Sequence, residues 1–242
     1  MIVILCHPGD AAALWLAGTM QEHRLAGVEL ITVEQLVYSR RIVYRLSDAG
    51  SSGSIALADG RSLRPEAVTG LVNRVAYLPT QHFARAAPAD RAYAEAELSA
   101  FLLAWINGVA GRVINPPRPV ALGCETFPLP TLVHLAAMAG LPTEPWRAST
   151  SGSDGTALPL PTTHSVVVFD GRLFGALLPR PLQDACRRLA VLLGVSLLQV
   201  DLNQTPERGW RFVNASGVVD FRIGGKMLAR DLAQAFARQA AA

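Results

Sequence analysis

The first apolar run of the chain sets the strongest constraint on its fold. Residues 2–6, IVILC, are uninterrupted apolar side chains, as is typical of a strand covered on both faces. Residues 11–27 then carry apolar side chains at three- and four-residue spacing and end on a glycine, which predicts a helix. A second strand is predicted in 28–36, VELITVEQL, leading into a short turn. Strand, helix and strand in this order form a βαβ unit, which implies a parallel sheet with a right-handed crossover.

The rest of the first half adds a hairpin, a buried strand and a long helix. The segments 41–48 and 53–63 predict a hairpin around the turn AGSSG, and 67–78 predicts another buried strand. A helix is predicted over 90–107, with Asp90 as its N-cap and an apolar stripe along one side.

The second half alternates strands and helices around one long loop. Residues 147–162 are rich in Ser, Gly, Thr and Pro, which favours an exposed, mobile loop. The predicted elements are a strand at 112–115, helices at 130–142, 181–195 and 226–239, a hairpin at 164–178 around Asp170-Gly171, and two antiparallel strands around the turn 203–209. We therefore predict an α/β fold with three parts. They are an N-terminal parallel βαβ domain (1–112), a linking helix and loop (113–162), and a C-terminal α+β half (163–242).

Composition excludes several classes of protein. The chain has 242 residues, of which 50% are hydrophobic, enough for one large core or two small ones. Its uncharged apolar runs are far shorter than the roughly 18–20 residues of a membrane span, and the N-terminus lacks the basic region of a signal peptide. The three cysteines, Cys6, Cys124 and Cys186, lie far apart without a CxxC motif. We expect inert thiols in a reducing cytoplasm.

The charge pattern does not predict a nucleic-acid surface. The formal net charge is +3, but the arginines are scattered and Lys226 is the single lysine of the sequence. Nucleic-acid binding needs clustered basic side chains as well as excess charge.

The order of elements resembles the ATP-grasp superfamily, in particular the RimK-like carboxylate–amine ligases and related ligases that modify peptides. The resemblance covers nearly the whole chain as a similarity of order and pattern. It is carried by LADGRSL (57–63), GLVNRV (70–75), RVINPP through GLPTEPW (112–146), VVVFDGRLFGALL (166–178), LAVLLGVSLLQVDL (189–202) and RGWRFVNASG (208–217). The resemblance implies an ATP-grasp-like architecture.

Four departures from the family pattern bear on activity. The family's phosphate-binding lysine is missing from GCETFPLP (123–130), and the mobile lid over ATP is replaced by the short stretch 147–162. A segment that carries an arginine shrinks to PRP (179–181), and the metal-binding Glu-x-Asn becomes Asn214-Ala215-Ser216. Phosphoryl transfer depends on cationic and metal groups that neutralise the phosphates and on exclusion of water. Together these losses argue against ATP-driven ligation by this chain on its own.

Candidate ligand residues follow two strands of the N-terminal domain. His7 and Asp10 lie in HPGD after the first strand, where open α/β sheets present ligand sites, although the same turn can simply cap the helix. Asn73 and Arg74 end a buried strand. Arg74 suits a bidentate contact to an anion or peptide carboxylate, or else a structural ion pair.

A second candidate set lies on the last pair of strands. The resemblance implies that Asp201 is the family's metal-binding Asp, and Asn214 and Ser216 occupy the neighbouring ligand positions. One carboxylate with neutral amide and hydroxyl groups attracts a divalent ion less than two carboxylates do. We expect Asp201 and Asn214 near the same end of an antiparallel pair, as a metal site that has lost its second acid.

Two unrelated enzyme classes fit less well. HPGD is similar to the HPDD opening of zinc-dependent LmbE-like deacetylases, but the five histidines provide no HxxH motif. A serine hydrolase would need a GxSxG elbow, which the sequence lacks.

The leading hypothesis is a degenerate, non-catalytic ATP-grasp homologue without a cofactor. It would bind a peptide, a small carboxylate ligand or a partner protein in the inter-domain cleft. The alternative is a minimal carboxylate–amine ligase that uses ATP and Mg and is completed by an oligomer neighbour, such as the second copy in a homodimer, or by a partner enzyme.

Overall fold

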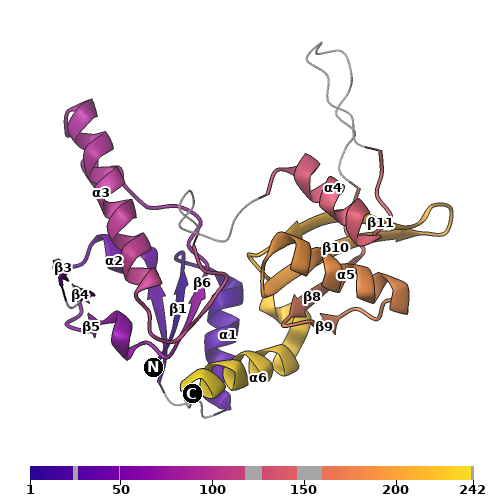
Figure 1. Cartoon of the computed structure of the whole chain (residues 1–242), viewed down its shortest axis with the longest axis horizontal. Coiled ribbons are helices and arrows are strands. Elements are labelled where there is room, and N and C mark those ends of the chain that lie inside the picture. Colours follow the sequence, from indigo (N-terminus) through magenta and orange to yellow (C-terminus); the bar gives the residue numbers. More distant parts are fainter. Residues whose placement is uncertain (24–26, 49, 118–126, 146–159, 241–242) are drawn as a thin grey trace. The chain divides into compact units, whose positions relative to one another are not determined.

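The computed structural model describes residues 1–23, 27–48, 50–117, 127–145 and 160–240, and divides into two compact units (Figure 1). The first comprises Met1–Glu125 and Ala229–Ala242, and the second comprises Thr126–Leu228. This division differs from the three parts predicted from the sequence, because the helix of the predicted linking segment packs within the second unit. The last helix also contributes residues to both units.

The first unit is built on the predicted parallel sheet. Its strands are β1 (Ile2–Cys6), β2 (Val28–Thr32), β6 (Gly70–Asn73) and β7 (Arg112–Ile114), in the order β2-β1-β6-β7. All three pairings are parallel, and α1 (Ala11–Glu22) connects β1 to β2, which confirms the βαβ opening. The α/β fold class is confirmed. β1 lies inside the sheet and is fully buried, as its uninterrupted apolar run predicted.

The second predicted strand is shorter than its sequence indicated. β2 ends at Thr32, and α2 (Val33–Val37) occupies the last part of the predicted strand at 28–36, which was wrong there. Thr32 Oγ1 accepts the backbone N–H of Gln35, and the Gln35 side chain accepts the backbone N–H of Thr32. This reciprocal capping box satisfies two N–H groups that have no partner within the helix.

A small antiparallel sheet lies beside the parallel one in the same unit. Its order is β3-β4-β5, formed by β3 (Arg41–Ser47), β4 (Gly50–Ala56) and β5 (Ser62–Leu63). The hairpin is confirmed, but its turn is tighter than AGSSG. Ser47 pairs with Gly50, so the Gly- and Ser-rich stretch belongs to the strand.

The long helix of the first unit, α3 (Pro88–Asn107), begins two residues before the predicted Asp90 cap. Ala87 occupies the N-cap position without a side-chain hydrogen bond, and Asp90 lies in the first turn, where its charge is favourable to the helix dipole. The C-terminal part of α3 packs into the core, where Trp105 is fully buried. Two short 3-10 helices, η1 (Pro65–Ala67) and η2 (Gln81–Phe83), complete the loops.

The second unit is an antiparallel sheet with two helices over one face. The strands are β8 (His164–Phe169), β9 (Arg172–Gly175), β10 (Leu197–Thr205) and β11 (Gly209–Ser216), in the order β11-β10-β8-β9. α4 (Leu129–Ala139) and α5 (Arg180–Leu193) share an apolar core with one face of this sheet. The predicted hairpin around Asp170-Gly171 is confirmed, with positive φ at both residues as a type I′ turn requires.

The last helix, α6 (Phe221–Ala240), is interrupted at Gly225, whose φ of 58° and ψ of −161° are not helical. Its longer segment starts at Lys226, as predicted. No helix in the described part of the chain is both long and apolar enough to cross a bilayer. The predicted exposed loop at 147–162 lies outside the described residues except for its last three positions, and so does the first half of GCETFPLP, which includes Cys124.

Two glycines test how closely the first unit is packed. A Cβ added at Gly111 would collide with the backbone of Thr69, whereas one added at Gly18 of α1 has no described neighbour within 4 Å. We expect Gly111→Ala to lower the free energy of unfolding by about 1–3 kcal/mol. Gly18→Ala, the matched control, should raise it by about 0.5–1 kcal/mol. Urea denaturation measures both changes, and a neutral Gly111→Ala would show that the backbone there is not held as described.

Candidate functional site

The first candidate site lies where the parallel sheet reverses its direction of winding. From β1 the chain moves to β2 on one side, and it later returns to β6 on the other side of β1. Such a switch point leaves a crevice outside the carboxyl ends of the two central strands, where open α/β sheets bind ligands. His7 and Asp10 follow β1 here, and Asn73 and Arg74 end or follow β6. The structure therefore brings these four predicted residues together.

Asp10 and Arg74 form a bidentate ion pair at this switch point. The Arg74 Nε–Asp10 Oδ2 distance is 2.7 Å, and the Arg74 Nη2–Asp10 Oδ1 distance is 3.0 Å. The Arg74 and Asp10 side chains are only 7% and 15% exposed, so water screens the pair poorly. Asp10 also caps α1 by accepting the backbone N–H groups of Ala12 and Ala13. Both structural roles considered for these residues, the capping turn and the ion pair, are thus present.

These contacts decide the ionisation of Asp10. Burial by itself would raise the pKa of Asp10. Hydrogen bonds from the Arg74 guanidinium and from the N–H groups of Ala13 and Ala12, together with the Arg74 charge, outweigh burial and hold that pKa below its usual value. Asp10 is therefore an anion at neutral pH, unsuited to donating a proton.

His7 and Asn73 hold the loop that follows β6. His7 Nε2 accepts the backbone N–H of Ala76 at 2.9 Å, and its ring stacks on Tyr77 with centroids 4.2 Å apart. Asn73 is 3% exposed, and its Oδ1 accepts the N–H of Val75 at 3.2 Å. His7 Nδ1 is buried without a partner among the described residues. Since Nε2 is an acceptor, Nδ1 carries the proton of the neutral ring and is an unsatisfied donor.

The second candidate site lies on the β10–β11 pair, which is antiparallel as predicted. Asp201 and Asn214 are directly opposite each other, with a bulge just after Asp201, and Gln199 is opposite Ser216. Asp201 Oδ1 accepts hydrogen bonds from Ser165 Oγ at 2.7 Å and from Gln199 Nε2 at 2.9 Å. Asn214 is exposed, and Ser216 Oγ accepts the N–H of Val218. Asp201 and Asn214 thus lie side by side, while the Ser216 side chain stabilises the turn before α6.

Ser165 and Gln199 are site residues that the sequence analysis missed. Gln199 lies two positions before Asp201 and so shares its face of the strand, a signal present in the sequence. Ser165 comes from β8, and only the pairing of Asp201 with Ser165 reveals it. Gln199 Oε1 accepts the N–H of Asp220, which connects this polar cluster to the start of α6.

The donor set around Asp201 is a poor fit for the metal that the resemblance implies. Magnesium takes oxygen ligands in near-octahedral geometry, including one or two carboxylates. Here one carboxylate is present, its Oδ1 is occupied by two hydrogen-bond donors, and the Gln199 amide oxygen is used by Asp220. In the described ranges, no group of three or more His, Cys, Asp and Glu side chains could hold a metal ion.

Two of the three cysteines are buried and free. Burial raises the pKa of the Cys6 thiol to about 11 and that of Cys186 to about 12. Both thiols are protonated at neutral pH, so neither is an activated nucleophile.

Comparisons with known proteins identify the architecture. No family model matches the sequence, and no curated protein matches it. The macrocyclase MdnB from Microcystis aeruginosa MRC superposes with a TM-score of 0.66 at 16% identity, over 98% of this chain and 97% of that chain. The ATP-grasp ligase PsnB, complexed with minimal precursor, Mg and ADP, gives 0.67 at 17% identity, over 100% and 98%.

A third match is a RiPP-associated ATP-grasp ligase from Chryseobacterium gregarium, in complex with ADP and a leader and core peptide. Its TM-score is 0.66 at 9% identity, over 99% of this chain and 96% of that chain. At such low identities these matches establish the fold, which is the one that the sequence resemblance predicted.

Removing Arg74 tests the role of the ion pair. We expect Arg74→Met to lower the free energy of unfolding by about 3–5 kcal/mol, because Asp10 would stay buried without its counter-ion. Arg91→Met removes an exposed pair with Glu95 in the same unit and should leave stability close to wild type. Urea denaturation of both variants measures the difference. Equal effects would contradict a stabilising role specific to the buried pair.

The lowered pKa of Asp10 predicts an acid-sensitive step in stability. The unfolded-state pKa is near 3.9, so ionised Asp10 stabilises the fold above that pH. This contribution is lost as pH falls through the lower folded-state pKa. Denaturation curves between neutral pH and about pH 3 should show a smaller loss of stability on acidification for Asp10→Asn than for wild type. Identical pH dependence would contradict the assignment.

Proposed function

The chain has an ATP-grasp-like fold, and from this premise we propose that it is a peptide-binding ATP-grasp homologue whose catalytic centre has degenerated. Its ligand is a peptide, a small carboxylate compound or the terminus of a partner protein. The residues that serve binding are His7, Asp10, Asn73, Arg74, Asp201, Asn214 and Ser216.

Peptide binding is supported by what the structural neighbours contain. The PsnB and Chryseobacterium gregarium structures contain a precursor, or a leader and core peptide, and the similar macrocyclase MdnC from Microcystis aeruginosa MRC is bound with precursor peptide MdnA. The likeness to each extends over 98% or more of this chain. We infer that the same architecture serves peptide recognition here.

The Asp201 cluster is the observation that carries the proposal of lost catalysis. Asp201 Oδ1 already accepts two hydrogen bonds, so this site offers a metal ion little more than the second oxygen of a single carboxylate. Its cross-strand partner is the neutral Asn214. The missing lysine in 123–130 and the short stretch 147–162 support the same conclusion from the sequence.

A second candidate function is a minimal ATP-dependent carboxylate–amine ligase. PsnB structures contain Mg and ADP or AMPPNP, which favours a nucleotide-dependent protein over one without a cofactor. In this alternative, the missing cationic groups come from an oligomer neighbour or a partner enzyme. Nucleotide binding distinguishes the two functions.

We expect ATP with magnesium to leave the melting temperature of the protein unchanged. A ligand at a concentration one hundred times its Kd would stabilise the fold by about 2.7 kcal/mol, so binding would be evident in a thermal-shift assay. A dose-dependent rise at micromolar ATP would overturn the degenerate site and favour the ligase.

Asn214→Glu supplies the second acid and serves as the positive control. It should create a stabilisation by Mg or Mn that wild type lacks, while Asn214→Gln, which keeps the amide, should not. If Asn214→Gln responds as strongly as Asn214→Glu, the effect does not come from the restored acid.

A further inference from the structure

One strand of the first unit has an open edge. β3 lies at the end of the order β3-β4-β5, and among the described residues β4 is the one strand that it pairs with. Alternate N–H and C=O groups of an edge strand point away from its partner and are free to pair with another chain. Natural proteins usually shield such edges, or use them to bind an extended peptide.

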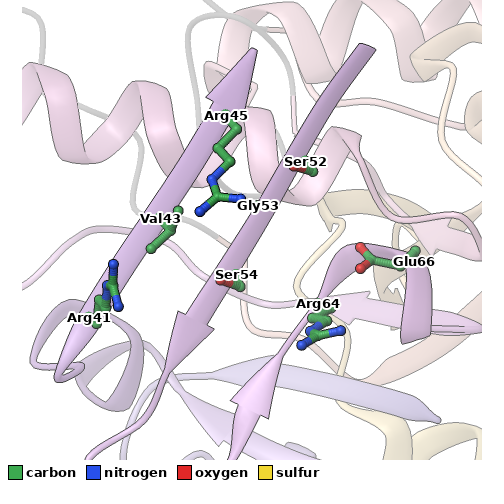
Figure 2. A pocket seen from close by; sticks show the side chains of 8 residues that line it. All are labelled: Arg41, Val43, Arg45, Ser52, Gly53, Ser54, Arg64 and Glu66. Carbon is green, nitrogen blue, oxygen red and sulfur yellow. The ribbon is translucent and has the colours of Figure 1, made fainter. Parts of the chain in front are cut away.

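The first face of β3 presents positive charge. Every second residue of β3 lies on this face, which gives it Arg41, Val43 and Arg45. Figure 2 shows their side chains on β3 across from the serine side chains of β4. Together with Arg64 they line a polar pocket of about 380 Å³, in which Glu66 is the one acidic residue beside the three arginines. The side chains of Arg41, Arg45 and Arg64 have no hydrogen-bond or ion-pair partner within the described part of the chain.

The opposite face of β3 presents apolar surface. Ile42 and Tyr44 are 37% and 38% exposed and line a groove of about 630 Å³ together with apolar side chains of α3. Tyr44 packs edge-on against Phe101, with ring centroids 6.1 Å apart, so the wall of this groove is ordered by a specific contact.

We propose that β3 binds an extended peptide that alternates acidic and apolar side chains, which adds to the sheet as a further strand. Side chains of a strand alternate between two faces, so such a peptide places its acids beside Arg41 and Arg45 and its apolar residues beside Ile42 and Tyr44. Backbone hydrogen bonds along the edge of β3 contribute affinity for any extended peptide, and the two faces of β3 select the side chains.

Charge argues against a second copy of this chain as the occupant. A copy paired antiparallel through β3 would have its own arginines on the same face, which gathers four guanidinium groups without counter-ions. Like charges on neighbouring strands are destabilising, and basic side chains on edges oppose such self-association. A peptide that alternates acidic and apolar side chains instead matches the basic face and the apolar face of β3.

This inference deepens the peptide-binding part of the proposed function and rests on it only for the class of ligand. None of the β3 residues belongs to the ligand set that includes Arg74 and Asp201. Asp201→Asn should therefore leave this interaction intact, so failure at one surface is distinguishable from failure at the other.

The test uses a fluorescent, end-blocked peptide of alternating Glu and Val that matches the seven residues of β3. Fluorescence anisotropy with the full chain at low salt should show saturable binding. The Lys–Val counterpart and a peptide with the same composition in two blocks should bind at least about tenfold more weakly. The first has no acids, and the second divides its acids between both faces.

Strand addition has a signature that loose charge attraction lacks. N-methylation of one alternate set of peptide amides should abolish binding, while methylation of the other set should not, since a strand pairs through one edge. Hydrogen exchange of β3 amides should slow on binding. Arg45→Gln should weaken binding by about fivefold, and Arg85→Gln, a matched exposed arginine outside the pocket, by less than twofold.

Four outcomes would overturn the proposal. They are equal binding of the blocked and alternating peptides, equal effects of the two N-methylated sets, equal affinity for a single-stranded oligonucleotide, and a concentration-dependent dimer that is lost in Arg45→Gln.

Discussion

The buried ion pair between Asp10 and Arg74 is the contact on which the first unit depends. It joins the turn after β1 to the residue after β6, the two neighbouring strands of the parallel sheet. The same carboxylate caps α1, so one side chain positions a helix and an adjacent strand end. Because both partners are shielded from water, separating them leaves a buried charge. This constraint holds the ends of β1 and β6 together at the switch point and explains why Asp10 is already satisfied without a ligand.

The second unit places its polar cluster on a different kind of support. Val200 and Leu202 face the core shared with α4 and α5, so the alternation of the strand turns Gln199 and Asp201 to the other face. There the carboxylate is held by neutral donors from its own strand and from β8. A pair of acids would have resisted this arrangement by mutual repulsion, and would have needed a cation. Because Asn214 is neutral, the ATP-grasp-like scaffold can hold a hydrogen-bonded cluster where a pair of acids would need a cation.

Figure 1 places β3, β4 and β5 as a separate small sheet beside the parallel one in the first unit. β4 is rich in Gly and Ser, which are weak strand formers, but Ile55 of β4 and Leu63 of β5 are buried in the core of the first unit. An added strand would supply hydrogen bonds to the open edge of β3. Strand alternation alone puts Arg41 and Arg45 on one face of β3, and folding adds Arg64 to the same pocket.

The sequence by itself determined the elements whose signals are local. The apolar run of β1 and the Asp170-Gly171 turn each act through neighbouring residues, and both are as predicted. Position after a strand also indicated the first site, because carboxyl ends of parallel strands share one edge. Tertiary structure decided the pairing of Asp10 with Arg74, the contribution of Ser165, and the position of Arg64 in the pocket beside β3. Each of these depends on register between distant segments, which is set by burial over the whole sheet and not by any local pattern.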